Sequence, residues 1–267
     1  MTTKQSLILF ALLCVLVASQ SQTIKGFPAS SFTREQGDWY DNWGIDRNYY
    51  AGPDGYLPKL ATETLNENKE LAYSIGQWFQ TNYPTETGRA AAILKYVQTW
   101  TVYGYDSDNV LRDGAPQEEW AWNADEMAHA FNETTGVKAI GDCEDMAFLC
   151  GTIYVGAGFD AAIVDAPEHV ALLIWLPEFS NANYYWNLMN DSRDAGWIWV
   201  EATDSSNPLG WTPPDFKDGG WTAYAIGNLE FVAEPELPQL TIDTELLIIV
   251  VVAIFSIILT LARGRRR

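Results

Sequence analysis

Two cysteines on one predicted helix are the residues whose type and spacing most clearly limit the chemistry open to this chain. Cys143 and Cys150 are seven residues apart, which places their Cα atoms roughly 10 Å apart along a helix. A disulfide needs Cα atoms within about 7 Å, and two sulfurs on one zinc ion lie about 4 Å apart. The spacing therefore argues against a disulfide and a zinc site, and the two histidines, His129 and His169, do not complete a better ligand set.

The two thiols are expected to differ in reactivity because they lie at different points of this helix. Cys150 is one turn from Tyr154, and we interpret it as a packing residue of the core. Cys143 is in the first turn, where unpaired N–H groups and the helix dipole favour a thiolate by roughly 1 kcal/mol. Acidic neighbours on both sides oppose a thiolate unless their side chains turn away. A reactive Cys143 therefore needs a nearby imidazolium, and without one it is a structural cysteine.

Three short segments carry a resemblance to a known family. Gly141-Asp142-Cys143-Glu144-Asp145 resembles the nucleophile motif of the transglutaminase-like cysteine enzymes. Glu168-His169-Val170 and Trp199-Val200-Glu201-Ala202-Thr203 follow it. In that family a Cys begins a helix, a His begins the next strand region and an acid ends a later strand. The order and spacing match over roughly residues 85–212, whereas residues 24–84 resemble nothing we recognise.

The resemblance implies a papain-like arrangement of three catalytic residues. Cys143 is then the nucleophile that attacks an amide carbonyl to form a thioester. His169 takes the thiol proton and later protonates the leaving amine. Glu201 orients the imidazole and stabilises its charged form. The family usually has Asp at the third position, so Asp204 is an alternative, and we prefer Glu201 because it ends the predicted strand.

Residues that could support this chemistry are less well defined by the sequence. The backbone N–H of Cys143 is a natural oxyanion donor, and Trp122 and Tyr103 are candidates for a second one. The acidic run at 106–113 superficially resembles a calcium loop but lacks the Gly and distal Glu of an EF-hand, so we expect an acidic surface loop. His129 is expected to be a partly exposed structural histidine. We therefore expect no metal and no cofactor.

The elements that must position these residues can be read from the periodicity of apolar residues. Helical spacing predicts helices over Ala61–Thr81, Thr85–Tyr103, Ala124–Phe131 and Cys143–Val155. Strand-forming runs follow at Ala161–Val164, His169–Leu176 and Trp197–Glu201. The aromatic-rich residues 24–58 are expected to be irregular structure packed on the domain. Helices followed by strands predict an α+β domain, and the resemblance adds a papain-like, transglutaminase-like core with the nucleophile at a helix N-terminus followed by an antiparallel sheet.

Both ends of the chain predict export and membrane attachment. Residues 1–21 combine Lys4, an apolar run and small residues, which is typical of a signal peptide, with an uncleaved signal anchor as the alternative. Residues 246–262 are apolar and uncharged, and as a helix they span roughly 25 Å, enough to cross a bilayer. The four arginines in 263–267 predict a cytoplasmic tail. Residues 233–245, with two prolines, are expected to form a stalk.

Between these ends we expect an extension at 22–84, which includes the first helix, and the transglutaminase-like domain at 85–232. The chain has a net charge of −19. Residues 22–244 keep 11 basic and 34 acidic residues, a net charge of −23. We therefore do not expect this chain to bind nucleic acid, because such binding needs clustered Lys and Arg.

The sequence therefore predicts a membrane-anchored, extracytoplasmic thiol enzyme. Its partners are expected to be a peptide or protein substrate at the cell surface and the lipid bilayer. A cysteine peptidase and an acyl transferase share the thioester and differ in whether water or an amine attacks it. The Glu in place of Asp and the acidic surroundings of Cys143 keep an alternative open: a catalytically inactive module of this type that binds a surface glycan or protein.

Overall fold

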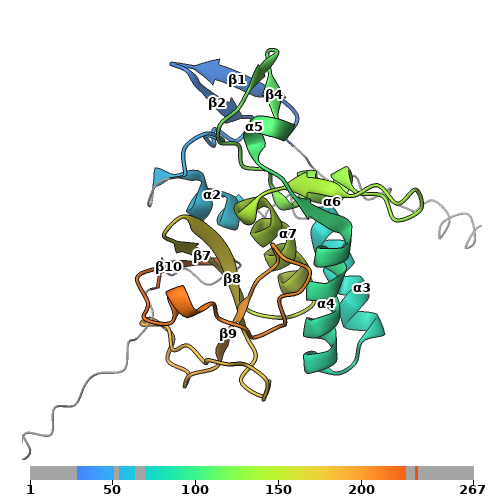
Figure 1. Cartoon of the computed structure of the whole chain (residues 1–267), viewed down its shortest axis with the longest axis vertical. Coiled ribbons are helices and arrows are strands. Elements are labelled where there is room, and N and C mark those ends of the chain that lie inside the picture. Colours follow the sequence, from blue (N-terminus) through green and yellow to red (C-terminus); the bar gives the residue numbers. More distant parts are fainter. Residues whose placement is uncertain (1–28, 51–53, 64–69, 227–231, 234–267) are drawn as a thin grey trace, which may run out of the picture. The chain divides into compact units, whose positions relative to one another are not determined.

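The computed structural model describes residues 29–50, 54–63, 70–226 and 232–233, all within the compact unit Met1–Glu236. These residues form a mixed α+β structure in which helices pack on one face of an antiparallel sheet (Figure 1). The α+β prediction is confirmed. The described helices are α2 (Tyr56–Glu63), α3 (Glu70–Asn82), α4 (Glu86–Trp100), α5 (Asp106–Asn109), α6 (Ala124–Ala130), α7 (Cys143–Gly156) and the 3₁₀ turn η3 (Pro214–Phe216).

Five strands form the main sheet in the order β11-β10-β7-β8-β9, and all neighbours are antiparallel. They are β7 (Ala161–Ala166), β8 (His169–Trp175), β9 (Trp197–Val200), β10 (Thr222–Ile226) and β11 (Val232–Ala233). The smaller pairs are β1 (Phe32–Glu35) with β2 (Asp38–Asp41), β3 (Thr101–Tyr103) with β6 (Ala139–Gly141), and β4 (Leu111–Arg112) with β5 (Ala115–Pro116). The three predicted strands are therefore confirmed, while β10 and β11 had no prediction.

The turn between β7 and β8 places His169 at the first position of β8. Ala166 pairs with His169, so only Pro167 and Glu168 form the turn. Glu168 adopts a left-handed backbone conformation with φ 57°. β8 then pairs with β9, and Glu201 comes directly after the last residue of β9. This hairpin and its neighbour bring the predicted histidine and acid to adjacent strands.

Helix α7 is the central helix, and it is buried on almost every side. It contacts α3, α4, α6 and the strands β7 and β8 (Figure 1). Its close approach to α3 requires two glycines, because a Cβ on Gly76 would lie 2.1 Å from the Ile153 carbonyl oxygen, and one on Gly156 would lie 2.2 Å from the Tyr73 carbonyl oxygen. The helix is thereby held with its N-terminus, and Cys143, at the edge of the core.

The opposite face of the sheet carries a second core made of aromatic side chains. Strand alternation sends Val170 and Leu172 to the helical side and Ala171 and Leu173 to this second core. The aromatic cover consists of Trp175, Tyr184, Trp186, Trp197, Trp199, Phe216 and Trp221. The sheet therefore lies between a helical layer and an aromatic layer.

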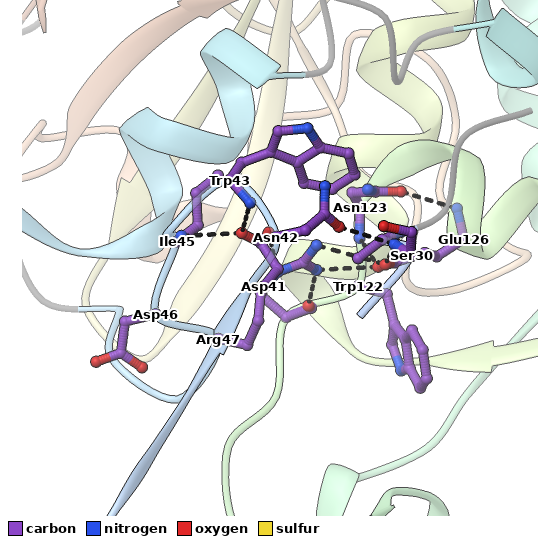
Figure 2. A network of polar contacts seen from close by, with 12 residues as sticks. Ser30, Asp41, Asn42, Trp43, Ile45, Asp46, Arg47, Trp122, Asn123 and Glu126 are labelled. Carbon is purple, nitrogen blue, oxygen red and sulfur yellow. Dashed lines mark hydrogen bonds and ion pairs between the residues drawn. The ribbon is translucent and has the colours of Figure 1, made fainter. Parts of the chain in front are cut away.

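Residues 24–58 were expected to be irregular, and this prediction is wrong for much of the described part. Strands β1 and β2 form a hairpin, and α2 begins at Tyr56. The fully buried Arg47 holds this segment to the domain (Figure 2). Its guanidinium donates to Asp41 Oδ2 at 2.9 Å, to Glu126 Oε2 at 2.9 Å and to the Ala121 carbonyl at 2.6 Å. A buried cation bonded to two carboxylates makes this extension part of the same folded unit.

Two predicted helices differ from the structure at their ends. The helix expected over Ala61–Thr81 is replaced by α2, which ends at Glu63, and α3, which begins at Glu70, with 64–69 outside the described residues. The helix expected to end at Tyr103 stops at Trp100, and the next three residues form β3. A Thr, a Val and a Tyr in succession favour a strand, and their pairing with β6 overrides the helical pattern.

The expected signal peptide at 1–21, the anchor at 246–262 and the tail at 263–267 lie outside the described residues. Within the described part of the chain, no helix has both the length and the apolar character needed to cross a bilayer. Residue 233, expected to begin the stalk, instead belongs to strand β11, and the rest of the stalk lies outside the described residues.

Candidate active site

His169 and Glu201 are in direct contact. The Nε2 atom of His169 lies 2.7 Å from Oε2 of Glu201, whose side chain is only 4% exposed. The Thr203 hydroxyl donates to the other carboxylate oxygen at 2.7 Å, and the Trp199 indole N–H donates to Oε2 at 3.4 Å. The Thr203 backbone N–H also donates to Glu201 Oε1 at 3.4 Å. These contacts fix the carboxylate and thereby set the orientation of the imidazole.

The structure also distinguishes the two acids that the sequence left open. Asp204 is exposed and accepts from the backbone N–H and the hydroxyl of Ser206, each at 2.8 Å. The Gln98 amide holds this loop by donating to the carbonyl oxygens of Glu201, Asp204 and Asn207 at 3.3, 2.8 and 3.0 Å. The acid that meets the imidazole is therefore Glu201, and Asp204 belongs to a surface turn.

Cys143 is the first residue of α7 and is half-buried, with Asp142 as the N-cap. Its thiol donates to Glu144 Oε2 at 3.4 Å. It also lies close enough to His169 for a side-chain hydrogen bond and a charge interaction that raise the pKa of the imidazole. The structure therefore brings together the thiol, imidazole and carboxylate that were predicted from three separate segments.

The electrostatics of this group favour a charged imidazole. Burial alone lowers the pKa of His169, but the hydrogen bonds and charges of Cys143 and Glu201 outweigh it and raise this pKa to about 10. Burial also raises the pKa of Glu201, and the bond to His169, with smaller contributions from Thr203 and Trp199, brings it below its usual value. The pair is therefore an imidazolium and a carboxylate at neutral pH.

Phe216, from the turn η3, completes the surroundings of the imidazole. Its ring lies nearly parallel to the His169 ring, with 8° between the planes and 5.6 Å between the centroids. It lies equally parallel to the Trp199 ring, at 10° and 5.4 Å. The aromatic layer of the sheet thus extends to the imidazole.

A cluster of carboxyl groups lies on the other side of Cys143. Its members are Asp106, Glu119, Asp142, Glu144 and Asp145, which come from α5, the segment before α6 and the start of α7. Burial is the main cause that raises their pKa values, that of Asp106 to about 8. The buried Tyr56 hydroxyl donates to Glu119 and lies 3.1 Å from Glu144 Oε1. Burial therefore favours the protonated forms of these carboxyl groups, which limits the negative charge beside the thiol.

Within the described residues, this cluster also contains the side chains that could hold a metal ion. Ligand atoms in each of three groups lie within 4.8 Å of one another: Asp142, Cys143 and Glu144; Asp106, Asp142 and Asp145; and Asp106, Glu119 and Glu144. Sets made only of carboxylate oxygens suit Ca²⁺ or Mg²⁺ rather than zinc.

The acidic surface loop predicted at 106–113 is therefore wrong at its first residue. Asp106 begins α5, is 4% exposed and accepts from the Trp120 backbone N–H at 2.6 Å. Asp108, Asn109 and Asp113 are exposed as expected. The hydrogen bond from the Trp120 backbone N–H turns the Asp106 side chain inward, and no local sequence pattern predicts this contact.

The two candidates for a second oxyanion donor differ in their availability. The Trp122 backbone N–H donates to Asp145 Oδ1 at 2.7 Å and is occupied. Tyr103 pairs with Gly141 in the β3–β6 ladder, two residues before Cys143, and its side chain is 41% exposed. Burial and the charge of Cys143 raise the pKa of its hydroxyl, which therefore keeps its proton. Tyr103 is the better placed donor.

A cavity of about 310 Å³ adjoins the site between the end of α4, β3 and the loop after β9. It is lined by Gln98, Thr101, Val102, Tyr103, Lys138, Met146, Ala202, Thr203, Asp204 and Ser205. Met146 is one helical turn from Cys143, and Thr203 is bonded to Glu201. The cavity is therefore lined by neighbours of Cys143 and Glu201 but not by these two side chains themselves.

Other residues singled out in the sequence lie away from this group. Cys150 is fully buried, and burial raises the pKa of its thiol, so the packing role is confirmed. His129 is exposed in the last turn of α6. Phe216 and Glu119 had no prediction, and Tyr56 was expected only as one aromatic residue of the irregular segment 24–58. Each reaches the site only through long-range packing, away from any recognisable motif.

Comparison with protein-family models, with curated proteins and with solved structures finds no match to this chain. What the site can do chemically follows from its own side chains. A thiol at a helix N-terminus, an imidazole raised in pKa and a buried carboxylate bonded to that imidazole are the groups needed for nucleophilic attack on a carbonyl.

Proposed function

We propose that this chain is a transglutaminase-like thiol enzyme that cleaves or transfers peptide or isopeptide amide bonds through a thioester on Cys143. The observation that carries the proposal is the bond between His169 and Glu201 on an imidazole that also meets the Cys143 thiol. A structural cysteine does not need this pairing. The papain-like arrangement belongs to the same proposal, and its support is a nucleophile at the start of α7 followed by an antiparallel sheet.

The geometry suggests how protons move. Glu201 occupies Nε2 of His169, so Nδ1 is the ring nitrogen left for the thiol. The imidazolium holds the proton that the thiol and the imidazole share, and the Cys143 thiolate attacks the amide carbonyl carbon. When the tetrahedral intermediate collapses, the C–N bond breaks and the imidazolium protonates the leaving amine. Water or a second amine then attacks the thioester, gives its proton to the imidazole and releases Cys143.

The negative charge that develops on the carbonyl oxygen needs donors. The backbone N–H of Cys143, at the N-terminus of α7, supplies one. The protonated hydroxyl of Tyr103, in the strand beside Cys143, supplies the second. The cavity lined by Tyr103, Met146 and Thr203 receives the part of the substrate next to the scissile bond.

The place of the reaction is part of the proposal. The signal-type residues 1–21 and the apolar run 246–262 with its arginine tail support an extracytoplasmic domain held on a bilayer. The substrate is then a peptide or protein at the cell surface. The net charge of −23 over residues 22–244 favours cationic over acidic substrates.

A second candidate function has its own supporting observation. A hollow of about 590 Å³ between α3 and α4 is rich in aromatic rings and lies apart from the catalytic group. It is lined by Ile75, Trp78, Phe79, Tyr83, Ala92, Lys95, Tyr96, Thr99, Trp100 and Glu133. Aromatic faces with a few polar groups are typical of ligand sites, so this hollow favours the inactive module that binds a surface glycan or protein.

Alkylation of the full-length chain with iodoacetamide at pH 6, followed by mass spectrometry, tests the proposal. If the chain is a thiol enzyme, Cys143 should react with iodoacetamide faster than a cysteine in an unstructured peptide does. His169→Ala should slow this reaction by at least tenfold. His129→Ala removes the other histidine, which is exposed, and is expected to change nothing. If Cys143 is alkylated no faster than the peptide cysteine, and if His169→Ala does not change its alkylation rate, the thioester mechanism is wrong.

A further inference from the structure

We infer that Phe216 is a positioning residue for His169: its ring holds the imidazole in the plane that directs one nitrogen to Glu201 and the other to Cys143. The inference rests on the proposed function of these three residues. Phe216 is 47 residues after the histidine in the chain, and nothing in the local sequence around it resembles a catalytic motif.

The contact between the two rings is a parallel stack rather than an edge contact. The planes differ by 8° and the centroids are 5.6 Å apart, within the distance at which an aromatic face stabilises a cation. The His169 side chain is 20% exposed, and the Glu201 side chain is 4% exposed. Phe216 therefore covers the face of an imidazole whose edge is already held by a carboxylate.

Phe216 is itself held in place from three directions. Its ring stacks on Trp199, whose indole N–H donates to the same Glu201 oxygen that binds His169. Its carbonyl accepts from the Trp221 indole N–H at 3.1 Å, and its N–H donates to the Pro213 carbonyl at 3.2 Å. The ring is thus part of the aromatic layer of the sheet and is already in position before any substrate binds.

Three consequences follow for the imidazole. A flat ring against its face restricts rotation about the Cβ–Cγ bond, which would otherwise turn Nε2 away from Glu201. The same ring excludes water from that face and offers its negative π-face to the imidazolium. An aliphatic side chain of similar volume excludes water but does neither of the other two things, so the aromatic character of Phe216 is what the inference depends on.

The titratable groups that act on His169 come from two elements. Cys143 acts from the start of α7, and Glu201 acts from the end of β9. Phe216 carries no charge and does not alter either group chemically. A change in the titration of His169 on replacing Phe216 therefore reports the stacking contact itself.

Nuclear magnetic resonance of the full-length chain provides a readout that is independent of substrate. The chain has only two histidines, so the ring signals of His169 can be assigned with a His129→Gln variant. We expect Phe216→Leu to lower the titration midpoint of His169 by about one pH unit, the size of a partly shielded cation–aromatic contact. Phe216→Tyr, which keeps the ring, is expected to restore the wild-type midpoint.

A matched control separates stacking from general loss of the aromatic layer. Tyr184 belongs to the same layer, is partly buried and packs at a tilt of 44° against Trp186, but makes no ring contact with His169 among the described residues. Tyr184→Leu is expected to leave the His169 midpoint unchanged. If Phe216→Leu folds poorly, Phe216→Met supplies a second non-aromatic variant, and near-ultraviolet circular dichroism shows that the rest of the layer is intact.

The outcomes also separate this inference from the proposed function. Suppose that wild-type Cys143 is alkylated fast and that His169→Ala slows the reaction, as the proposed function requires. If both non-aromatic variants then leave the His169 midpoint within 0.2 pH units of wild type, or if Phe216→Tyr fails to restore it, the positioning role is wrong while the proposed function is supported. If Cys143 is slow and indifferent to His169 while Phe216→Leu still shifts the midpoint, the stacking is real and the thioester mechanism is wrong.

Discussion

His169 and Glu201 form a diagonal pair across two neighbouring antiparallel strands, with Nε2 2.7 Å from Oε2. The paired register ends with Leu172 opposite Val200; continued past the end of β9, it would place Thr203 opposite His169 and Glu201 two positions away on the same face. Thr203 uses its hydroxyl to hold the other carboxylate oxygen. A longer Glu side chain can span this diagonal, which gives a physical reason for Glu where the resembled family usually has Asp.

The first prediction concerns this pair. Glu201→Gln removes the charge that supports the imidazolium, so the pKa of His169 is expected to fall. Alkylation of Cys143 at pH 6 should then slow by about tenfold or more, because a fall of one pKa unit removes about 1.4 kcal/mol of the interaction that holds the imidazolium in place beside the thiol. Asp204→Asn, in the neighbouring surface turn, is the matched control and should leave the rate unchanged. An equal effect of both variants would contradict the assignment of Glu201.

The second prediction tests Tyr103 as an oxyanion donor. Tyr103→Phe removes only the hydroxyl, and we expect thioester formation from a peptide ester or amide probe to fall by about 10²–10³, the usual cost of losing one donor. Alkylation of Cys143, which develops no oxyanion, should be unchanged. Tyr105→Phe is the control, since Tyr105 is 64% exposed and packs edge-on against Tyr103. Equal losses in both assays would instead indicate a disturbed thiol.

The third prediction concerns the buried acids. The pKa of Asp106 is raised to about 8, mainly by burial, so the folded state retains a proton that the unfolded chain releases near pH 4. Its contribution to stability is full below that lower pH and is lost as the pH rises through about 8. Melting temperatures measured with a chelator present should fall between pH 5 and 8, and Asp106→Asn should flatten that slope. Asp108→Asn, exposed in the same helix, should not.

The fourth prediction tests the link between the amino-terminal hairpin and the domain. Arg47→Met leaves Asp41 and Glu126 buried without their cation, and breaking such a pair typically costs about 3–5 kcal/mol. Urea unfolding should show this loss. Arg34→Met, in β1, removes an exposed guanidinium and should cost less than about 1 kcal/mol. A small effect of Arg47→Met would mean that the hairpin is not held by this network.

The fifth prediction tests the packing of α3 against α7. Gly76→Ala places a methyl group 2.1 Å from the Ile153 carbonyl oxygen, and only a backbone shift can relieve it, at a cost of about 1–3 kcal/mol. Gly88→Ala is the matched control, because its Cβ meets only the flexible Thr85 hydroxyl at 2.7 Å. In the exposed first part of α4 this change should be neutral or stabilising. Chemical unfolding of the two variants distinguishes these outcomes.

Much of the local structure around the site could be predicted because its signals are short-range. The start of α7 at Cys143 follows from the N-cap Asp142 and the helical run behind it, and the structure has both. The turn before His169 follows from Pro167 between two strand-forming runs. By contrast, β3 was predicted as helix, because only its pairing with β6 decides its conformation.

The sequence by itself determined where a thiol, an imidazole and two candidate acids stand relative to helix and strand ends, because capping, turns and periodicity act over a few residues. Only the tertiary structure decided that Glu201 rather than Asp204 meets His169, that Phe216 stacks on it, and that Asp106 joins the acids around Cys143. These choices depend on strand register and on burial between segments far apart in the chain, and neither leaves a local pattern in the residues concerned.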